Sequence, residues 1–154
     1  MALNYNFVQI LGAGRLALSQ RPKVKEIKDL TNVGCDQLVT ILSVKDRPQN
    51  IGAEVEACGL QWHWLKVANA NKISDQERLL FKSLVHTVYA AILDNKSVLV
   101  HCSAGLHRTG MFAYALLRHA NLDQAEALEI IGQMRPATQE ALEDKYLNLA
   151  EGLY

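Results

Sequence analysis

Short apolar runs alternate with polar segments along the first half of the chain, and this pattern predicts strands joined by helices and loops. The weak alternation from Arg15 to Ser19 predicts an edge strand. Leu38 to Leu42 is apolar and β-branched, which is typical of a buried strand, and Trp62 to Val67 predicts another. The polar segment from Lys45 to Glu54 contains a proline and a glycine, so we expect a loop there.

Two capping boxes give the clearest helix signals. In each, a short polar side chain stands three positions before a glutamate, so that each side chain can bind the other residue's backbone amide. Ser74 with Glu77 begins one helix, and Asp123 with Glu126 begins another that continues to about Gln133. The first helix has one apolar face, which consists of Phe81, Leu84, Val85, Val88 and Ile92.

The segments around these helices complete the predicted elements. Helical spacing from Val24 to Leu30 predicts a helix, and Ser97 to His101 predicts a strand. The run from Thr109 to His119 is apolar almost all round, as expected for a central buried helix. A break at Arg135-Pro136 precedes a last helix, predicted from Glu140 to Glu151.

A strand, a capped helix and a second strand of these lengths form a βαβ unit, which requires parallel pairing. We therefore expect an α/β fold with a central, mostly parallel sheet flanked by helices. No shift in composition and no internal repeat marks a second domain, so residues 1–154 are expected to form a single domain. Parallel sheets bind ligands beyond the carboxyl ends of their strands, and His101 ends one of the predicted strands.

Composition narrows the range of functions. Of the 154 residues 49% are hydrophobic, and 16 basic residues balance 16 acidic ones. A neutral chain has no overall attraction to nucleic acid or to an anionic membrane. Residues 1–9 lack the pattern of a signal peptide, and the longest apolar run, Met111 to Leu117, is too short to cross a bilayer. We expect a soluble, cytoplasmic protein.

The chain has three cysteines, Cys35, Cys58 and Cys102. Their odd number and the absence of a C-x-x-C pair argue against a disulfide scaffold and against a zinc site. Cys102 is distinguished from the other two by the residues that follow it.

The strongest chemical signal is the segment His101-Cys102-Ser103-Ala104-Gly105-Leu106-His107-Arg108-Thr109-Gly110. The five residues between Cys102 and Arg108 are too few for a helix or a hairpin, so we expect a loop whose amides point inward. Such a nest binds an anion, and the following helix adds the positive end of its dipole. Gly105 provides the backbone freedom that the curl needs. These groups favour a thiolate at Cys102, and the planar fork of Arg108 can hold two phosphoryl oxygens.

This segment resembles the signature loop of the protein tyrosine phosphatase superfamily, and the short chain resembles its compact dual-specificity-type catalytic domain. The resemblance implies that Cys102 attacks phosphorus and forms a phosphocysteine, which water then hydrolyses. It implies that Arg108 clamps the phosphoryl group and that neither a metal nor another cofactor is needed. The residues implied to bind the substrate are Ser103, Ala104, Gly105, Leu106 and His107.

Four neighbouring positions have supporting or open roles. The resemblance makes His101 a buried partner of the cysteine backbone, while the Thr109 hydroxyl can donate to the departing sulfur. Gln139 resembles the family glutamine that orients the hydrolytic water, or it is a polar residue at a helix start. His107 stands where the family usually has glycine. It either lies at the rim of the pocket and touches the substrate, or points to solvent.

The proton donor for the leaving oxygen is the least defined part of the site. The family usually supplies an aspartate about thirty residues ahead of the cysteine, but positions 69–72 hold no acid. Asp75, 27 residues ahead of Cys102, is the nearest candidate. A place at a helix start favours its ionised form, so Asp75 alternatively stabilises the helix alone. Asp46 and Glu140 are further candidates.

The favoured function is that of a protein tyrosine or dual-specificity phosphatase. The alternatives are a phosphatase of inositol or other small phosphates and a phosphate-binding pseudophosphatase. The signature loop has no lysine, which favours protein or aryl phosphates, although Lys45 and Arg47 in the preceding loop can attract anionic substrates. We expect a phosphorylated protein or a small phosphate ester as the partner, neither nucleic acid nor membrane, and a monomeric chain. Whether Cys35 or Cys58 protects Cys102 by a disulfide is open.

Overall fold

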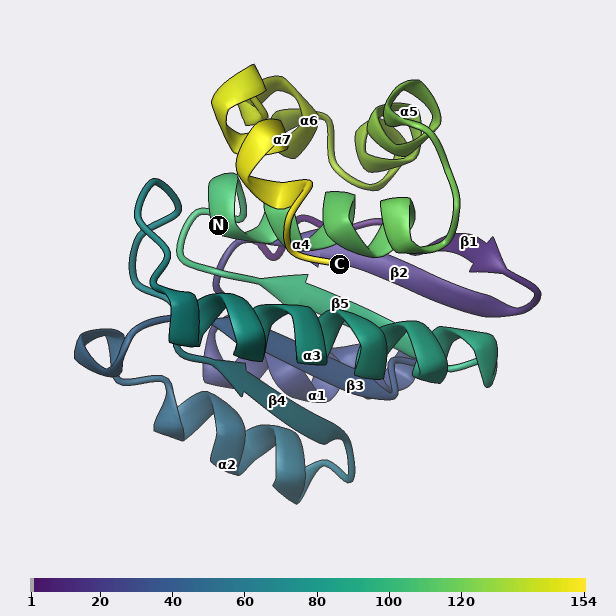
Figure 1. Cartoon of the computed structure of the whole chain (residues 1–154). Coiled ribbons are helices and arrows are strands. Elements are labelled where there is room, and N and C mark those ends of the chain that lie inside the picture. Colours follow the sequence, from purple (N-terminus) through teal and green to yellow (C-terminus); the bar gives the residue numbers. More distant parts are fainter. Residues whose placement is uncertain (1) are drawn as a thin grey trace.

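The computed structural model describes residues 2–154, which form a five-stranded sheet between two layers of helices (Figure 1). The strand order is β1-β2-β5-β3-β4; β1 pairs with β2 antiparallel, and all other pairs are parallel. The predicted α/β fold with a mostly parallel central sheet is therefore confirmed. The strands are β1 (Val8–Leu11), β2 (Gly14–Ser19), β3 (Gln37–Ile41), β4 (Gln61–Leu65) and β5 (Ser97–His101).

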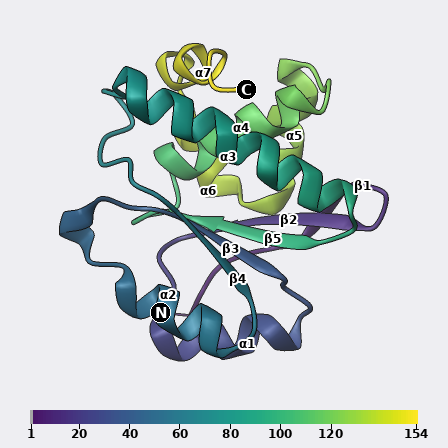
Figure 2. The ribbon, with the colours of Figure 1, turned by 60° about the horizontal axis from the view of Figure 1, so that its bottom comes forward.

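The helices cover the two faces of the sheet unequally, as the tilted view in Figure 2 shows. One face packs against α1 (Val24–Asn32) and α2 (Gln49–Ala57). The other carries α3 (Asp75–Leu93), α4 (His107–His119), α5 (Gln124–Met134), α6 (Pro136–Ala141) and α7 (Asp144–Ala150). Alternate residues of β5 supply the two cores, with Val98 and Val100 in the larger one and Leu99 in the smaller.

Both capping boxes form as predicted. The Ser74 hydroxyl accepts from the Glu77 amide at 3.1 Å, and the Glu77 carboxylate accepts from the Ser74 amide at 2.9 Å. Asp123 and Glu126 make the same reciprocal pair at 2.8 and 3.0 Å. These bonds satisfy amides that a helix leaves free in its first turn, which explains why α3 and α5 start where the sequence indicates.

The prediction that Arg15 to Ser19 is an edge strand was wrong. β2 lies inside the sheet, because β1 pairs with it on one side and β5 on the other. β1 was not expected, because its four residues, VQIL, are too few to give a clear pattern of apolar and polar positions. A tight turn at Gly12, whose φ is +54°, brings the two strands together.

The expected loop from Lys45 to Glu54 is also corrected. A 3₁₀ turn at Val44–Asp46 overlaps the start of this segment, and most of α2 lies within it. Gly52 suggested a loop, but in the structure it packs closely against Trp62. An added Cβ at Gly52 would lie 2.3 Å from the Trp62 ring. Because Ile51 and Val55 bury one side of α2, tertiary packing outweighs the poor helix propensity of glycine.

The predicted last helix from Glu140 to Glu151 is two helices, α6 and α7. Leu142 lies between them with φ −84° and ψ 78°, outside the helical region. Its side chain packs against Gly110 of α4, where an added Cβ would meet Leu142 at 2.8 Å. The break therefore lets a leucine reach the core beneath the signature loop.

Candidate active site

The segment from Cys102 to Leu106 connects β5 to α4 at the carboxyl end of the parallel strands. α4 begins at His107, two residues before the expected start at Thr109, so Arg108 lies in the first helical turn. The amide end of α4 thus faces the loop, and Cys102 is buried with 3% of its surface exposed. A helix N-terminus and a curled loop at one point favour an anionic ligand there.

Gly105 determines the curl of the loop. Its φ is +73°, and a Cβ would lie 2.3 Å from the Ser19 carbonyl oxygen at the end of β2. The Arg21 amide donates to the Ser103 carbonyl oxygen at 2.9 Å, which ties the same β2–α1 connection to the loop. The loop is therefore held tightly against the end of β2.

Arg135 holds the loop from the opposite side, a role that the sequence did not reveal. This arginine is 9% exposed, and its Nη1 donates to the Gly105 carbonyl oxygen at 3.0 Å. The buried Thr138 hydroxyl donates to the same oxygen. Arg135-Pro136 had indicated a helix break alone, and contacts across 30 residues of sequence leave no local pattern.

His101 is fully buried in a chain of hydrogen bonds behind the cysteine. Trp62 Nε1 donates to Thr40 Oγ1 at 2.9 Å, and Thr40 Oγ1 lies 2.7 Å from His101 Nε2. His101 Nδ1 lies 2.9 Å from the Cys102 carbonyl oxygen, which can accept alone, so Nδ1 carries the proton and Nε2 accepts from Thr40. Burial lowers the pKa of His101 to about 4, which keeps the ring neutral; the hydrogen bond to Cys102 opposes this shift, and the charges of Arg21 and Arg108 add to it.

The guanidinium of Arg108 is held by two acceptors. Its Nη1 donates to the Val67 carbonyl oxygen at 3.1 Å and lies 3.8 Å from Asp46 Oδ2. Asp46 accepts in turn from the Ser43 amide and hydroxyl at 2.8 and 2.9 Å. Partial burial raises the pKa of Asp46, but these hydrogen bonds and the charges of Arg108 and Arg21 outweigh it, so the pKa lies below its usual value.

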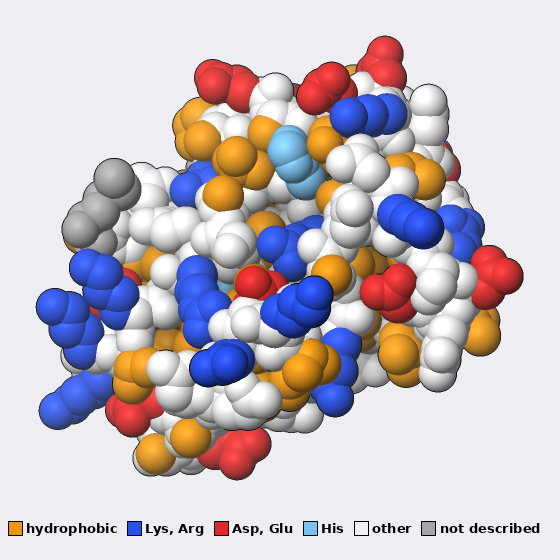
Figure 3. All heavy atoms as spheres, turned by 90° about the vertical axis from the view of Figure 1, so that its left-hand side faces the viewer, with side chains coloured by type: hydrophobic (Ala, Val, Ile, Leu, Met, Phe, Trp, Pro, Cys, Tyr) orange, Lys and Arg blue, Asp and Glu red, His pale blue; other side chains and the backbone are white. Residues whose placement is uncertain are grey.

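A cavity of about 270 Å³ opens over the loop. The loop and the start of α4 form one wall, and the connection between β4 and α3 forms the other. Seen from this end of the molecule (Figure 3), Lys and Arg side chains gather around a hollow with an acidic side chain among them. The lining residues are Ala68, Asn69, Ala70, Asn71, Cys102, Ala104, Leu106, His107 and Arg108.

Comparison with known proteins agrees with this geometry. The family model for the dual specificity phosphatase catalytic domain matches residues 18–145. The chain belongs to this family. Its compact domain is of the cysteine-dependent protein tyrosine phosphatase superfamily, as the signature loop indicated. No curated protein sequence matches the chain.

Solved structures share the fold of this dual-specificity-type domain. Tk-PTP in its active form is 22% identical, with a TM-score of 0.74 and coverage of 91% of each chain. The kinase associated phosphatase, with its catalytic-site cysteine changed to serine, is 15% identical, with a TM-score of 0.77 and coverage of 97% of this chain and 93% of its own. The core catalytic domain of the PP-IP phosphatase SIW14 from S. cerevisiae is 13% identical, with a TM-score of 0.70 and coverage of 100% and 88%.

Four further predicted site residues do not line this pocket. Ser103 is exposed on the loop, and the buried Thr109 hydroxyl has no hydrogen-bond partner among residues 2–154. Asp75 is the exposed first residue of α3, and it does not line the pocket. Gln139 is exposed on α6 with its amide against Gly132 of α5, where an added Cβ would lie 2.7 Å away.

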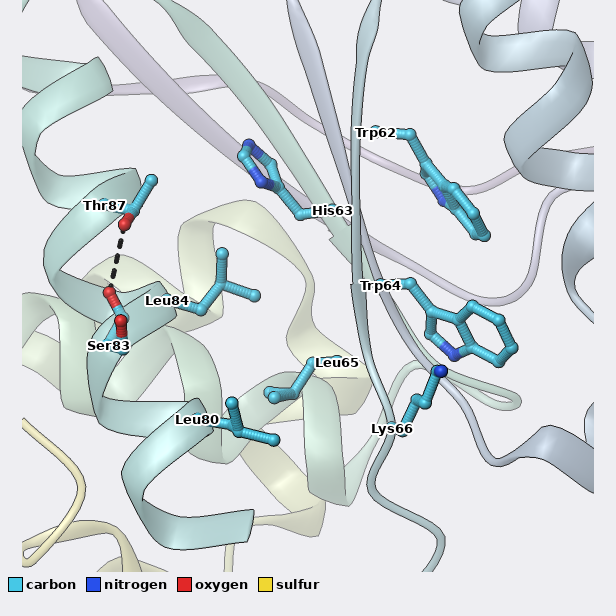
Figure 4. Close-up of a pocket in the computed structure, with 9 residues that line it drawn as sticks. All are labelled: Trp62, His63, Trp64, Leu65, Lys66, Leu80, Ser83, Leu84 and Thr87. Carbon is cyan, nitrogen blue, oxygen red and sulfur yellow. Dashed lines mark hydrogen bonds between the residues drawn. The ribbon is translucent and has the colours of Figure 1, made fainter. Parts of the chain in front are cut away.

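A second cavity, of about 520 Å³, lies between β4 and α3 (Figure 4). His63 and Leu84 face each other across it, while Trp64 projects from the other side of β4 with Lys66 over its ring. Neither Cys102 nor Arg108 lines this cavity. Among the described residues, no helix is both long and apolar enough to cross a membrane.

Proposed function

We propose that this phosphatase domain hydrolyses phosphomonoesters through a phosphocysteine on Cys102, with phosphotyrosine or phosphoserine and phosphothreonine of proteins as its substrates. One observation carries the proposal: Cys102 and Arg108 line the same cavity, at the carboxyl end of β5 and the amide end of α4. The nucleophile and the phosphate clamp thus meet one bound phosphoryl group.

The positions of the side chains support the following roles. Cys102 attacks phosphorus, and Arg108 with the inward amides from Ser103 to His107 holds the equatorial oxygens. The unpartnered, buried Thr109 hydroxyl supports its role as donor to the sulfur when the phosphocysteine breaks down. His101 positions the Cys102 carbonyl, and Gln139 stays a prediction for orienting the hydrolytic water.

The substrate assignment rests on the chemistry of the loop. Ser103, Ala104 and Leu106 offer no cation beyond Arg108, so the floor binds one phosphoryl group and does not favour a highly phosphorylated ring. Proteins that share this fold include the PP-IP phosphatase SIW14 and PTPMT1, which was solved in complex with PI(5)P. A small phosphate is therefore the second candidate, and the basic residues in Figure 3 favour it.

The test is hydrolysis of p-nitrophenyl phosphate between pH 5 and 7.5 by wild-type protein and by Cys102→Ser. We expect turnover that vanadate inhibits and chelators leave unchanged, and none by the variant. Inactivity of the wild-type protein, or equal activity of both proteins, would overturn the proposal and leave the pseudophosphatase alternative. Phosphotyrosine peptides, phosphoserine peptides and inositol phosphates, compared by kcat/KM, then rank the substrate classes.

A further inference from the structure

The imidazole of His107 has a defined place in the catalytic pocket. It is the first residue of α4 and lines the same cavity as Cys102 and Arg108. Its ring stacks on Tyr146 of α7, with centroids 4.3 Å apart and planes 14° from parallel. The stack holds the ring by its face, whereas the ring nitrogens lie at its edge. No hydrogen bond among residues 2–154 involves either ring nitrogen of His107, which lines the cavity.

The facing wall of the pocket has amides where the family usually has an acid. Asn69 and Asn71 line the cavity from the connection between β4 and α3. The Asn69 side-chain oxygen accepts a hydrogen bond from the backbone amide of Asn71 at 2.9 Å, which closes a local turn. A carboxamide has no proton to give at neutral pH, so this wall can bind a leaving group without protonating it.

The three acids that the sequence suggested as proton donors are either already paired or outside the pocket. Asp46 is already paired with Arg108 and accepts two hydrogen bonds from Ser43, an arrangement that favours the carboxylate. Asp75 begins α3, Glu140 is exposed on α6, and neither lines the cavity. Apart from the nucleophile, His107 is thus the pocket-lining side chain that can both give and take a proton.

We propose that His107 is the general acid of the first step and the general base of the second. The proposal rests on the phosphatase function proposed above. In the first step the Cys102 sulfur bonds to phosphorus, the ester P–O bond breaks, and the leaving oxygen takes both the electron pair and a proton from the His107 imidazolium. In the second step neutral His107 takes a proton from water as the water oxygen bonds to phosphorus. The S–P bond then breaks, and its electron pair returns to Cys102.

The decisive experiment compares His107→Gln with wild type on p-nitrophenyl phosphate, which has a good leaving group, and on phenyl phosphate, which has a poor one. We expect the variant to lose about 10²–10⁴-fold of its turnover of phenyl phosphate and less than tenfold with p-nitrophenyl phosphate. The ratio of the two rates does not depend on how much protein is folded. An equal loss on both substrates, or no loss on either, would overturn the proposal, whereas an inactive wild type would instead defeat the phosphatase function.

Two further variants separate this role from its rivals. Asn69→Asp adds a carboxyl group to the facing wall, and in the His107→Gln background it should restore at least tenfold of the lost phenyl phosphate turnover. His119→Gln, at the other end of α4, is the matched control and should keep the wild-type rate ratio. If Asp75→Asn changes the rate ratio and His107→Gln does not, the acid is Asp75 and the proposal is wrong.

Discussion

Replacing Gly105 with alanine tests whether the curl of the signature loop makes the site. Two costs arise at this position. The φ of +73° places an alanine in the left-handed region, at about 1–2 kcal/mol. The new Cβ would also lie 2.3 Å from the Ser19 carbonyl oxygen, roughly 1 Å short of a normal contact. Since that oxygen is backbone at the end of β2, the loop must move.

A displacement of this size lies beside the nucleophile and the phosphate clamp. A shift of about 1 Å in a catalytic group can cost about 10²-fold in rate. We therefore expect Gly105→Ala to lower kcat/KM for p-nitrophenyl phosphate about 100-fold and to lower Tm by at least about 2–4 °C. Steady-state kinetics and thermal denaturation measure the two effects.

Gly59→Ala is the matched control. Gly59 has a φ of +80°, but an added Cβ would meet nothing within 4 Å, and the residue lies between α2 and β4. This variant should therefore lose about 1–2 kcal/mol of stability and keep wild-type kcat/KM. If Gly105→Ala retains activity within threefold of Gly59→Ala, the loop does not need this curl and the reasoning is refuted.

Three other variants test the surroundings of the loop. His101, with its pKa lowered to about 4, stays neutral while the unfolded chain takes up a proton below about pH 6.5. The unfolding free energy should thus fall from pH 6.5 to 4, by at most about 3 kcal/mol, and urea denaturation should show a weaker dependence in His101→Asn. Asp46→Asn removes a negative charge 3.8 Å from Arg108, so inorganic phosphate should inhibit the variant about two- to fivefold more tightly; weaker inhibition would contradict this. Arg135→Met leaves a buried carbonyl with one donor fewer, so denaturation should show a loss of about 1–3 kcal/mol; an unchanged value would mean that the bond to Gly105 contributes nothing.

Local signals in the sequence predicted the elements that local interactions stabilise. The capping box of Ser74 and Glu77 fixed the start of α3, and the buried run of β5 with the following cysteine located the site. The elements that were missed depend on distant partners. Gly52 is helical because it packs against Trp62, and β1 exists through its pairing with β2.

The same distinction applies to the site. That Cys102 and Arg108 line one cavity was predictable, because only five residues separate them in the sequence. The hydrogen bond from Arg135 to Gly105 was not predictable. The Arg135-Pro136 pair indicates a helix break, and nothing in the neighbouring sequence shows that the arginine is buried against the loop. The proton donor was sought at a family distance in sequence, whereas His107, the proposed donor, lines the same cavity as Cys102.

The central claim is that Cys102 carries the phosphoryl group. Acid quenching of the enzyme within its first turnover of p-nitrophenyl phosphate, followed by peptide mass spectrometry, tests this directly. We predict one added phosphoryl group on the peptide that contains Cys102, and none on the same peptide from Cys102→Ser. Turnover by wild-type enzyme with no phosphorylated peptide, or with the group on another residue, would contradict the account.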